Sequence, residues 1–197
     1  MILYNVCDLS LNDFKCDLIF NDNDDFQHKH KHCIGVNCIN AHTMMPPFKL
    51  IAAMCSDGGM GYKGQLPWPH CKADMAHFAK RTTGLGNNAV IMGKKTWDSI
   101  PVHPLRRRAN LILSSHPPVD TVHPDEHWFA TMPELFTHLE SANYDEVWII
   151  GGASIYEQFL AMHKNNEIII DEMCITTMEP ICKCDTFFPL QLLHRIG

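Results

Sequence analysis

The feature that most constrains the fold is an alternation of short apolar runs with helix-permissive segments, which begins at Phe48. KLIAAMC (49–55), NAVIM (88–92) and VWII (147–150) are apolar and only long enough for strands. Such continuous runs are typical of strands buried on both faces of a parallel sheet. The alternation predicts an α/β fold, with a mostly parallel central sheet flanked by helices.

The remaining elements follow the same alternation. We predict further strands at 111–113, at 128–130 and within 167–177, and helices that end near 83–84 or lie at 93–100, 133–140 and 154–162. The helix at 133–140 places Leu135, Phe136 and Leu139 on one side. Since no repeat and no linker divides residues 48–197, we expect them to form one domain.

Residues 1–47 have a different character and are expected to be a disordered N-terminal extension. NDNDD (21–25) is polar and turn-prone, and HKHKHC (28–33), with Cys38 nearby, suggests either a metal site or a solvated tail. Because the spacing matches no zinc motif, we favour the tail and expect no metal. Met44 and Met45 precede the regular pattern, so one hypothesis is that the functional polypeptide starts there.

Composition narrows the class of partner. The formal net charge of -6 gives no basic footprint for nucleic acid. No apolar run reaches the length of about 18 residues that a membrane helix requires, so we expect no membrane partner. Nine cysteines, an odd number, without a recognisable secretion signal favour free thiols in a reducing, cytoplasmic compartment.

The stretch DGGMGYKGQLPWPHCKADMAHF (57–78) is the first candidate site. Its four glycines and two prolines suit a sharply bent loop that another molecule can approach closely. Asp74 and Phe78 are four residues apart and project from one helical face. This pattern indicates a carboxylate aimed into an apolar pocket; the alternative is an ordinary exposed Asp on an amphipathic helix.

Two strand-to-helix junctions favour phosphate binding. GKKT (93–96) offers backbone N–H groups beside two cations, and GGAS (151–154) permits close backbone approach at a second helix start. Together with Ser114 and Ser115 at another strand end, they suggest a ligand with several phosphates, such as a dinucleotide. The alternative is that the glycines serve packing and the lysines are solvated. No GxGxxG follows the first strand, so this is not the usual Rossmann fingerprint.

Four motifs now carry a specific resemblance. LPWP (66–69), VIMGKKTWDSIP (90–101), WIIGGASIY (148–156) and DTFFP (185–189) resemble the dihydrofolate reductase family in order and approximate spacing, across residues 48 to about 190. The resemblance implies a monomer that reduces 7,8-dihydrofolate to 5,6,7,8-tetrahydrofolate with NADPH, which supplies one-carbon metabolism and thymidylate and purine synthesis.

The resemblance also implies roles for individual residues. Asp74 matches the carboxylate that binds the pteridine ring, with Thr176 supporting it, Trp68 holding a water beside it and Leu66 lining the site. The folate-binding positions are Met75, Phe78, Ile100, Leu105, Arg108, Ile150 and Tyr156, where Arg108 pairs with the α-carboxylate of the substrate's glutamate. Arg106 and Arg107 are expected to face solvent.

The resemblance to this family also implies which residues bind the cofactor. The positions beside the nicotinamide or around the phosphates are Ala53, Met60, Gly61, Lys94, Lys95, Thr96, Ser114, Ser115, Gly151, Gly152, Ala153 and Ser154. In the family the Gly–Gly peptide is cis.

The chain departs from the family pattern near its end. Relatives continue past the position of Pro189 into two more antiparallel edge strands, whereas this chain ends with LQLLHRIG (190–197). We therefore expect the domain to lack its last two edge strands. This leaves an alternative function, a catalytically weak or inactive form that acts as a nucleotide-binding or interaction protein.

Overall fold

The computed structural model describes residues 3–7, 10–11, 14–15, 45–120 and 123–193. Its main sheet has the strand order β1-β10-β4-β9-β6-β7-β8, and all neighbouring strands in it run parallel. The predicted α/β fold with a mostly parallel sheet is confirmed. The strands are β1 (Leu3–Cys7), β10 (Ile170–Met178), β4 (Phe48–Cys55), β9 (Val147–Gly151), β6 (Asn88–Gly93), β7 (Arg108–Leu113) and β8 (Glu126–Phe129).

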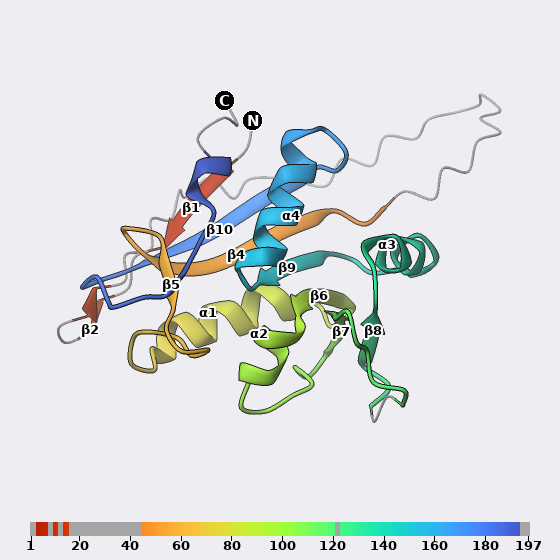
Figure 1. Ribbon diagram of the computed structural model, residues 1–197, viewed down its shortest axis with the longest axis horizontal. Coiled ribbons are helices and arrows are strands. Elements are labelled where there is room, and N and C mark those ends of the chain that lie inside the picture. The colour runs from red at the N-terminus through yellow and green to blue at the C-terminus, as the bar shows by residue number, and fades with distance from the viewer. Residues whose placement is uncertain (1–2, 8–9, 12–13, 16–44, 121–122, 194–197) are drawn as a thin grey trace.

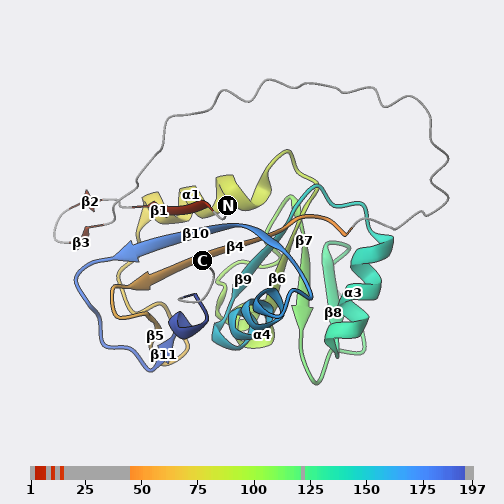
Figure 2. The same ribbon diagram turned by 90° about the horizontal axis from the view of Figure 1, so that it is seen from above.

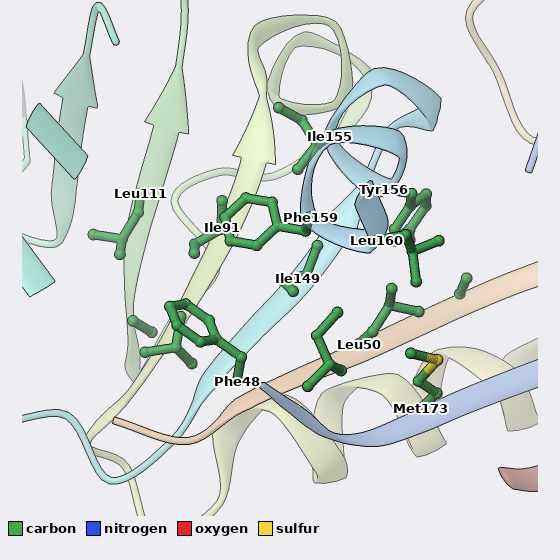
Figure 3. Packing of buried hydrophobic residues seen from close by; sticks show 14 of the residues in the cluster. Phe48, Leu50, Ile91, Leu111, Ile149, Ile155, Tyr156, Phe159, Leu160 and Met173 are labelled. Atoms are coloured by element: carbon green, nitrogen blue, oxygen red, sulfur yellow. The ribbon is translucent and has the colours of Figure 1, made fainter. Parts of the chain in front are cut away.

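Alternating side chains build a core on each face of this sheet. Leu50 on β4 and Ile91 on β6 point to the face covered by α3 (Met132–Ser141) and α4 (Ala153–Lys164), as Figure 3 shows for α4. Ile51 and Val90, their neighbours in sequence, belong to the cluster on the opposite face, with α1 (Lys72–Thr83) and α2 (Lys94–Ser99) (Figure 1). Burial on both faces explains why these strands read as continuous apolar runs.

Local signals fix the helix ends. The Thr131 side chain caps α3 by accepting a hydrogen bond from the Glu134 N–H, and a proline follows in the first turn. Gly84, with a φ of 52°, ends α1 at the predicted position. The strand β7 begins three residues before the predicted start, because the amide of Asn110 bonds the backbone of Leu105 and Arg108 and so tolerates burial.

The glycine-rich loop contains a short strand that the sequence did not predict. β5 (Gly59–Gly61) pairs antiparallel with β11 (Thr186–Phe187), and the two lie side by side in Figure 2. The Phe188 N–H also donates to the Gly58 carbonyl at 2.8 Å. This pairing joins segments more than 120 residues apart, so no local pattern could indicate it. After β11 the described chain ends in a short 3-10 helix, η1 (Leu190–Leu192).

Within the first 47 residues, the described segments are three short strands. The expected disorder of this extension stays a prediction. β2 (Ser10–Leu11) and β3 (Phe14–Lys15) pair with each other, while β1 adds to the edge of β10, from Leu3 opposite Glu172 to Cys7 opposite Thr176. An open strand edge offers unpaired backbone groups to such a segment. The histidine-rich segment 28–33 and Cys38 lie outside the described residues, and the domain boundary stays a prediction. The described helices include none that is both apolar and long enough to cross a membrane.

Candidate functional site

Asp74 is a buried carboxyl group near the start of α1. Its residue is only 6% exposed, and its side chain hydrogen-bonds Thr176 on β10. Burial raises the pKa of Asp74 above its ordinary value, and the bond to Thr176 opposes this only in part. Thr176 lies opposite Ala53 of β4 in the sheet, so a rigid strand pair supports the acid. The alternative of an exposed Asp on an amphipathic helix is therefore excluded by its burial.

The two other residues predicted around this acid differ in exposure. Trp68 is buried and packs in a small cluster with Cys55 and Met178, beside partly buried Ala53. Leu66 is 52% exposed. The structure thus anchors Trp68 at the end of β4, whereas Leu66 projects from the loop surface. Their roles stay predictions.

The predicted pterin-side residues fall into two groups. Phe78, Ile100, Leu105 and Ile150 come from four separate segments and pack against one cluster, on the face that carries α1 and α2. We call these four residues the apolar wall; they lie on the face of the sheet that also carries α1, the helix of Asp74. Tyr156 belongs to the core on the opposite face. Burial raises the pKa of its hydroxyl, and the negative charge of Asp74 adds a smaller increase.

Tyr156 and Met75 lie outside the apolar cluster that the other four residues contact. The Tyr156 hydroxyl donates to the Ile51 carbonyl at 2.7 Å, which fixes the first turn of α4 to β4. Met75 is partly buried next to Asp74 and is not among the residues of that apolar cluster. Their contacts with a folate stay predictions.

Arg108 carries a buried positive charge. It is 8% exposed, its guanidinium donates to the Thr82 hydroxyl and the Arg106 carbonyl, and it lies 5.8 Å from the centre of the Phe78 ring. Within the described part of the chain, no carboxylate lies within ion-pair distance of it. Burial lowers the pKa of Arg108, with Arg107 adding to this, and the charge is met here only by neutral acceptors. A guanidinium without a charged partner is suited to bind the carboxylate of a ligand through two parallel hydrogen bonds.

Thr82 is a contact that the sequence reasoning missed. Asp74, Phe78 and Thr82 are spaced four apart on α1, so they share one face of the helix. The fully buried Thr82 accepts from Arg108 and donates to the Phe78 carbonyl. Extending the Asp74–Phe78 spacing by one turn would have found it. Arg106 and Arg107 are exposed, as expected.

The predicted phosphate junctions meet at one end of the sheet. Met92 on β6 lies opposite Gly151 on β9, and Gly93 lies opposite Leu113, the residue before Ser114. A Cβ on Gly152 would lie 3.1 Å from the Thr96 hydroxyl, so the two glycine-containing motifs are in contact. Ala153 and Ser154 begin α4, whose Ile155 and Tyr156 N–H groups bond the Gly152 carbonyl. The Gly151–Gly152 peptide is cis.

Several of the other residues predicted to bind the cofactor contact neighbouring side chains at the surface. Lys94 pairs with Asp98 at 2.6 Å one turn along α2, and Lys95 is exposed. Ser114 and Ser115 both interact with His116 through their hydroxyls. These groups are accessible, and their binding to a nucleotide stays a prediction. The candidates on the glycine loop are Met60, which packs against the core under α4, and Gly61, which lies opposite Thr186.

Gly151→Ala is expected to destabilise the protein by at least about 2 kcal/mol, because strain and overpacking add. Gly151 has a φ of 104°, and a Cβ there would lie 2.7 Å from the Tyr156 ring. Gly64→Ala is the matched control, since Gly64 has a φ of 76° with nothing within 4 Å of an added Cβ. Urea unfolding of both variants measures the difference, and equal losses would contradict the packing role.

Asp74→Asn is expected to raise the melting temperature at pH 7. The folded-state pKa of Asp74 lies above the ordinary 3.8, so between these two values the native state keeps a proton that the unfolded chain releases. Stability therefore falls as pH rises through this window. Thermal unfolding of both proteins from pH 3 to 8 should show the gap appear above 3.8 and vanish below it. A gap that is constant over this range would contradict a raised pKa.

Comparison with known proteins agrees with this arrangement. A family model described as dihydrofolate reductase matches residues 47–194. The chain is 33% identical over 156 residues to dihydrofolate reductase from Aedes albopictus, which covers 74% of this chain and 80% of that protein. The match to dihydrofolate reductase from Heliothis virescens is 36% over 151 residues, or 71% and 77% of the two chains. Dihydrofolate reductase from Mus musculus is 33% identical over 160 residues, with 74% and 80% covered.

The matched residues span nearly the whole described domain, from the start of β4 to the end of η1. They include Asp74, Arg108 and both glycine junctions. With a family model over most of the chain and relatives above 30% identity, this chain belongs to the dihydrofolate reductase family.

Proposed function

We propose that this protein reduces 7,8-dihydrofolate to 5,6,7,8-tetrahydrofolate with NADPH, as a cytoplasmic monomer whose catalytic unit is residues 48–197. The observation that carries the proposal is the buried Asp74 carboxyl, held by Thr176 beside an apolar wall. A planar, partly apolar ring with polar edges suits such a site. The family to which the chain belongs gives the reaction its identity.

The cofactor fits the end of the sheet where the glycine junctions meet. A Cβ on Gly152 would lie 3.1 Å from the Thr96 hydroxyl, so the missing side chain keeps the backbone accessible between the two junctions, whereas a Cβ on Gly151 would meet the Tyr156 ring. Thr96 contributes a hydroxyl at the same place, and Lys94 and Lys95 contribute positive charge at the surface. When bound, NADPH supplies a hydride to C6 of the pterin.

Asp74 acts on the proton side of the reaction. N5 of the pterin must gain a proton as C6 gains hydride, and Asp74 is the ionisable group placed to favour the protonated ring. The raised pKa of Asp74 keeps more of the protonated carboxyl at neutral pH than an exposed aspartate would. Trp68 and the wall of Phe78, Ile100 and Leu105 exclude bulk water beside it.

Arg108 orients the other end of the substrate. Its guanidinium would receive the α-carboxylate of the glutamate tail, which supplies the counter-charge that the described protein does not. The alternative of an inactive nucleotide-binding form is not favoured, since the family match includes every position of the predicted site.

The direct test is an absorbance assay in which the purified full chain is mixed with NADPH and dihydrofolate. An enzyme should lose the reduced-nicotinamide absorbance near ~340 nm, at a rate of roughly 10 per second per molecule. The same mixture without dihydrofolate is the control. A folded protein that binds NADPH without this loss would contradict the proposed reaction and favour the nucleotide-binding form.

A further inference from the structure

Three thiols lie together where the glycine loop leaves β4. Cys55, the last residue of β4, is fully buried, and its sulfur accepts a hydrogen bond from the Cys182 N–H at 3.4 Å. The thiols of Cys182 and Cys184 both lie close enough to the Cys55 thiol to interact with it, and the Cys182 thiol also donates to the Pro180 carbonyl at 3.5 Å. Cys184 lies against the loop itself, since a Cβ on Gly59 would be 2.5 Å from its sulfur. All three are free thiols.

This thiol cluster, Cys55, Cys182 and Cys184, has no place in the proposed reaction. Cys55 and Cys182 nevertheless pack with Trp68 in one small apolar cluster. The cluster also spans the two ends of the loop: Gly58 bonds back to the Cys55 carbonyl, and Asp185 bonds to Gly61. A covalent bond here would tie the end of β4 to the segment that precedes β11.

We propose that Cys55 and Cys182 are a site of oxidative modification, which a hydroperoxide converts into an intramolecular disulfide. Cys182 is the first thiol to react, because it is partly exposed whereas Cys55 is buried. Its sulfur is oxidised to a sulfenic acid while the hydroperoxide is reduced to an alcohol, or to water in the case of hydrogen peroxide. The Cys55 sulfur then displaces water from the sulfenic acid, which forms the S–S bond.

Cys182 is the expected partner of Cys55 for two geometric reasons. Its backbone N–H donates to the Cys55 sulfur, and it belongs to the same apolar cluster as Cys55, to which Cys184 does not belong. Burial raises the pKa of Cys182 and, together with the neighbouring Cys55 and Asp57, raises that of Cys184 to about 11. Few thiolates are present at neutral pH, so the reaction should be slow and should accelerate as pH rises from about 7 to 9.

The modification should restrict the glycine loop. β5 is already paired with β11, and a Cys55–Cys182 bond would fix the remaining side of the loop at the end of β4. Motions that admit and release a nicotinamide would then be slower, so oxidised protein should turn over more slowly and recover when a dithiol reductant is added. This consequence rests on the proposed function, whereas the disulfide does not.

The test treats the full chain with hydrogen peroxide and maps its peptides by mass spectrometry without reduction. We expect a cross-linked peptide pair that contains Cys55 and Cys182, lacks two hydrogen atoms and disappears after reduction. Cys182→Ser should abolish it, whereas Cys71→Ser, which changes another partly buried thiol of the same apolar cluster, should retain it.

Two results would overturn the assignment. A link from Cys55 to Cys184 or Cys71 instead would show that the pairing is wrong, and oxidation that stops at a sulfenic or sulfinic acid would show that no disulfide site exists. Because peptide mapping needs no substrate, its outcome stays separate from that of the reductase assay. If Cys182→Ser fails to fold, mapping of the unaltered chain still decides the proposal.

Discussion

Replacing Asp74 by asparagine is expected to lower turnover with dihydrofolate by about 100-fold or more, the usual contribution of a positioned acid. The asparagine side chain keeps the shape and the hydrogen-bonding capacity of the carboxyl group, but it has no proton to give and no charge to stabilise a protonated pterin. Because Asp74 lies on α1, away from the glycine junctions on β6 and β9, NADPH affinity should change little. Steady-state turnover and NADPH titration by fluorescence measure the two effects.

The pH dependence gives this prediction a second readout. Turnover that needs a proton on Asp74 falls as pH rises through its pKa, and burial moves that fall above the ordinary carboxyl range. The fall should be present in the unaltered protein and absent from the residual activity of Asp74→Asn. Glu157→Gln, a change to an exposed carboxylate of α4, is the matched control and should leave both values unchanged. Near-normal turnover in Asp74→Asn would defeat the assignment.

The fold was predictable wherever a buried element has a recognisable pattern of apolar residues in its own sequence. Strands such as β6 and β9 are buried on both faces, so their sequences are uninterrupted apolar runs with clear limits. β7 was predicted too short because Asn110, a polar residue, is buried and satisfied by backbone groups nearby. The polarity of a residue reports its average preference, not the partners that a fold gives it.

Strands that form only by pairing with a distant segment have no recognisable pattern in their own sequences. β5 and β11 are each too short to show a period, and they become strands only because they lie opposite each other. β1 likewise depends on the open edge of β10 and not on its own pattern. These elements were missed for the same physical reason, since the stabilising partner is absent from the local sequence.

The site was predictable to a similar extent. The spacing of Asp74 and Phe78 placed the acid beside apolar residues, and the glycines marked both junctions. Thr176 entered only through resemblance, because its bond to Asp74 joins a strand to a helix far away in sequence. The Arg108–Thr82 contact and the thiol cluster were missed, since each depends on side chains that the folded chain alone brings together.

Arg108→Met is expected to raise the KM for dihydrofolate by roughly 30-fold or more, because losing one partner of a desolvated charge pair costs about 2–5 kcal/mol. The turnover number should change less, since Arg108 would hold the glutamate tail and not the reacting ring. A dihydropterin that lacks the glutamate should be reduced equally well by both proteins. Arg106→Met, at an exposed position two residues away, is the control for a general loss of positive charge.

The same variant separates binding from folding. In the protein alone the Arg108 charge is buried against Thr82 and a backbone carbonyl, without a carboxylate among the described residues, so it is a cost to the folded state that a bound substrate would relieve. Arg108→Met should therefore bind dihydrofolate more weakly and yet unfold at an equal or higher urea concentration. A variant that loses stability and affinity together, with the tail-less dihydropterin equally affected, would show that Arg108 is a structural residue. Opposite signs for the two quantities are what a site built for an external carboxylate requires.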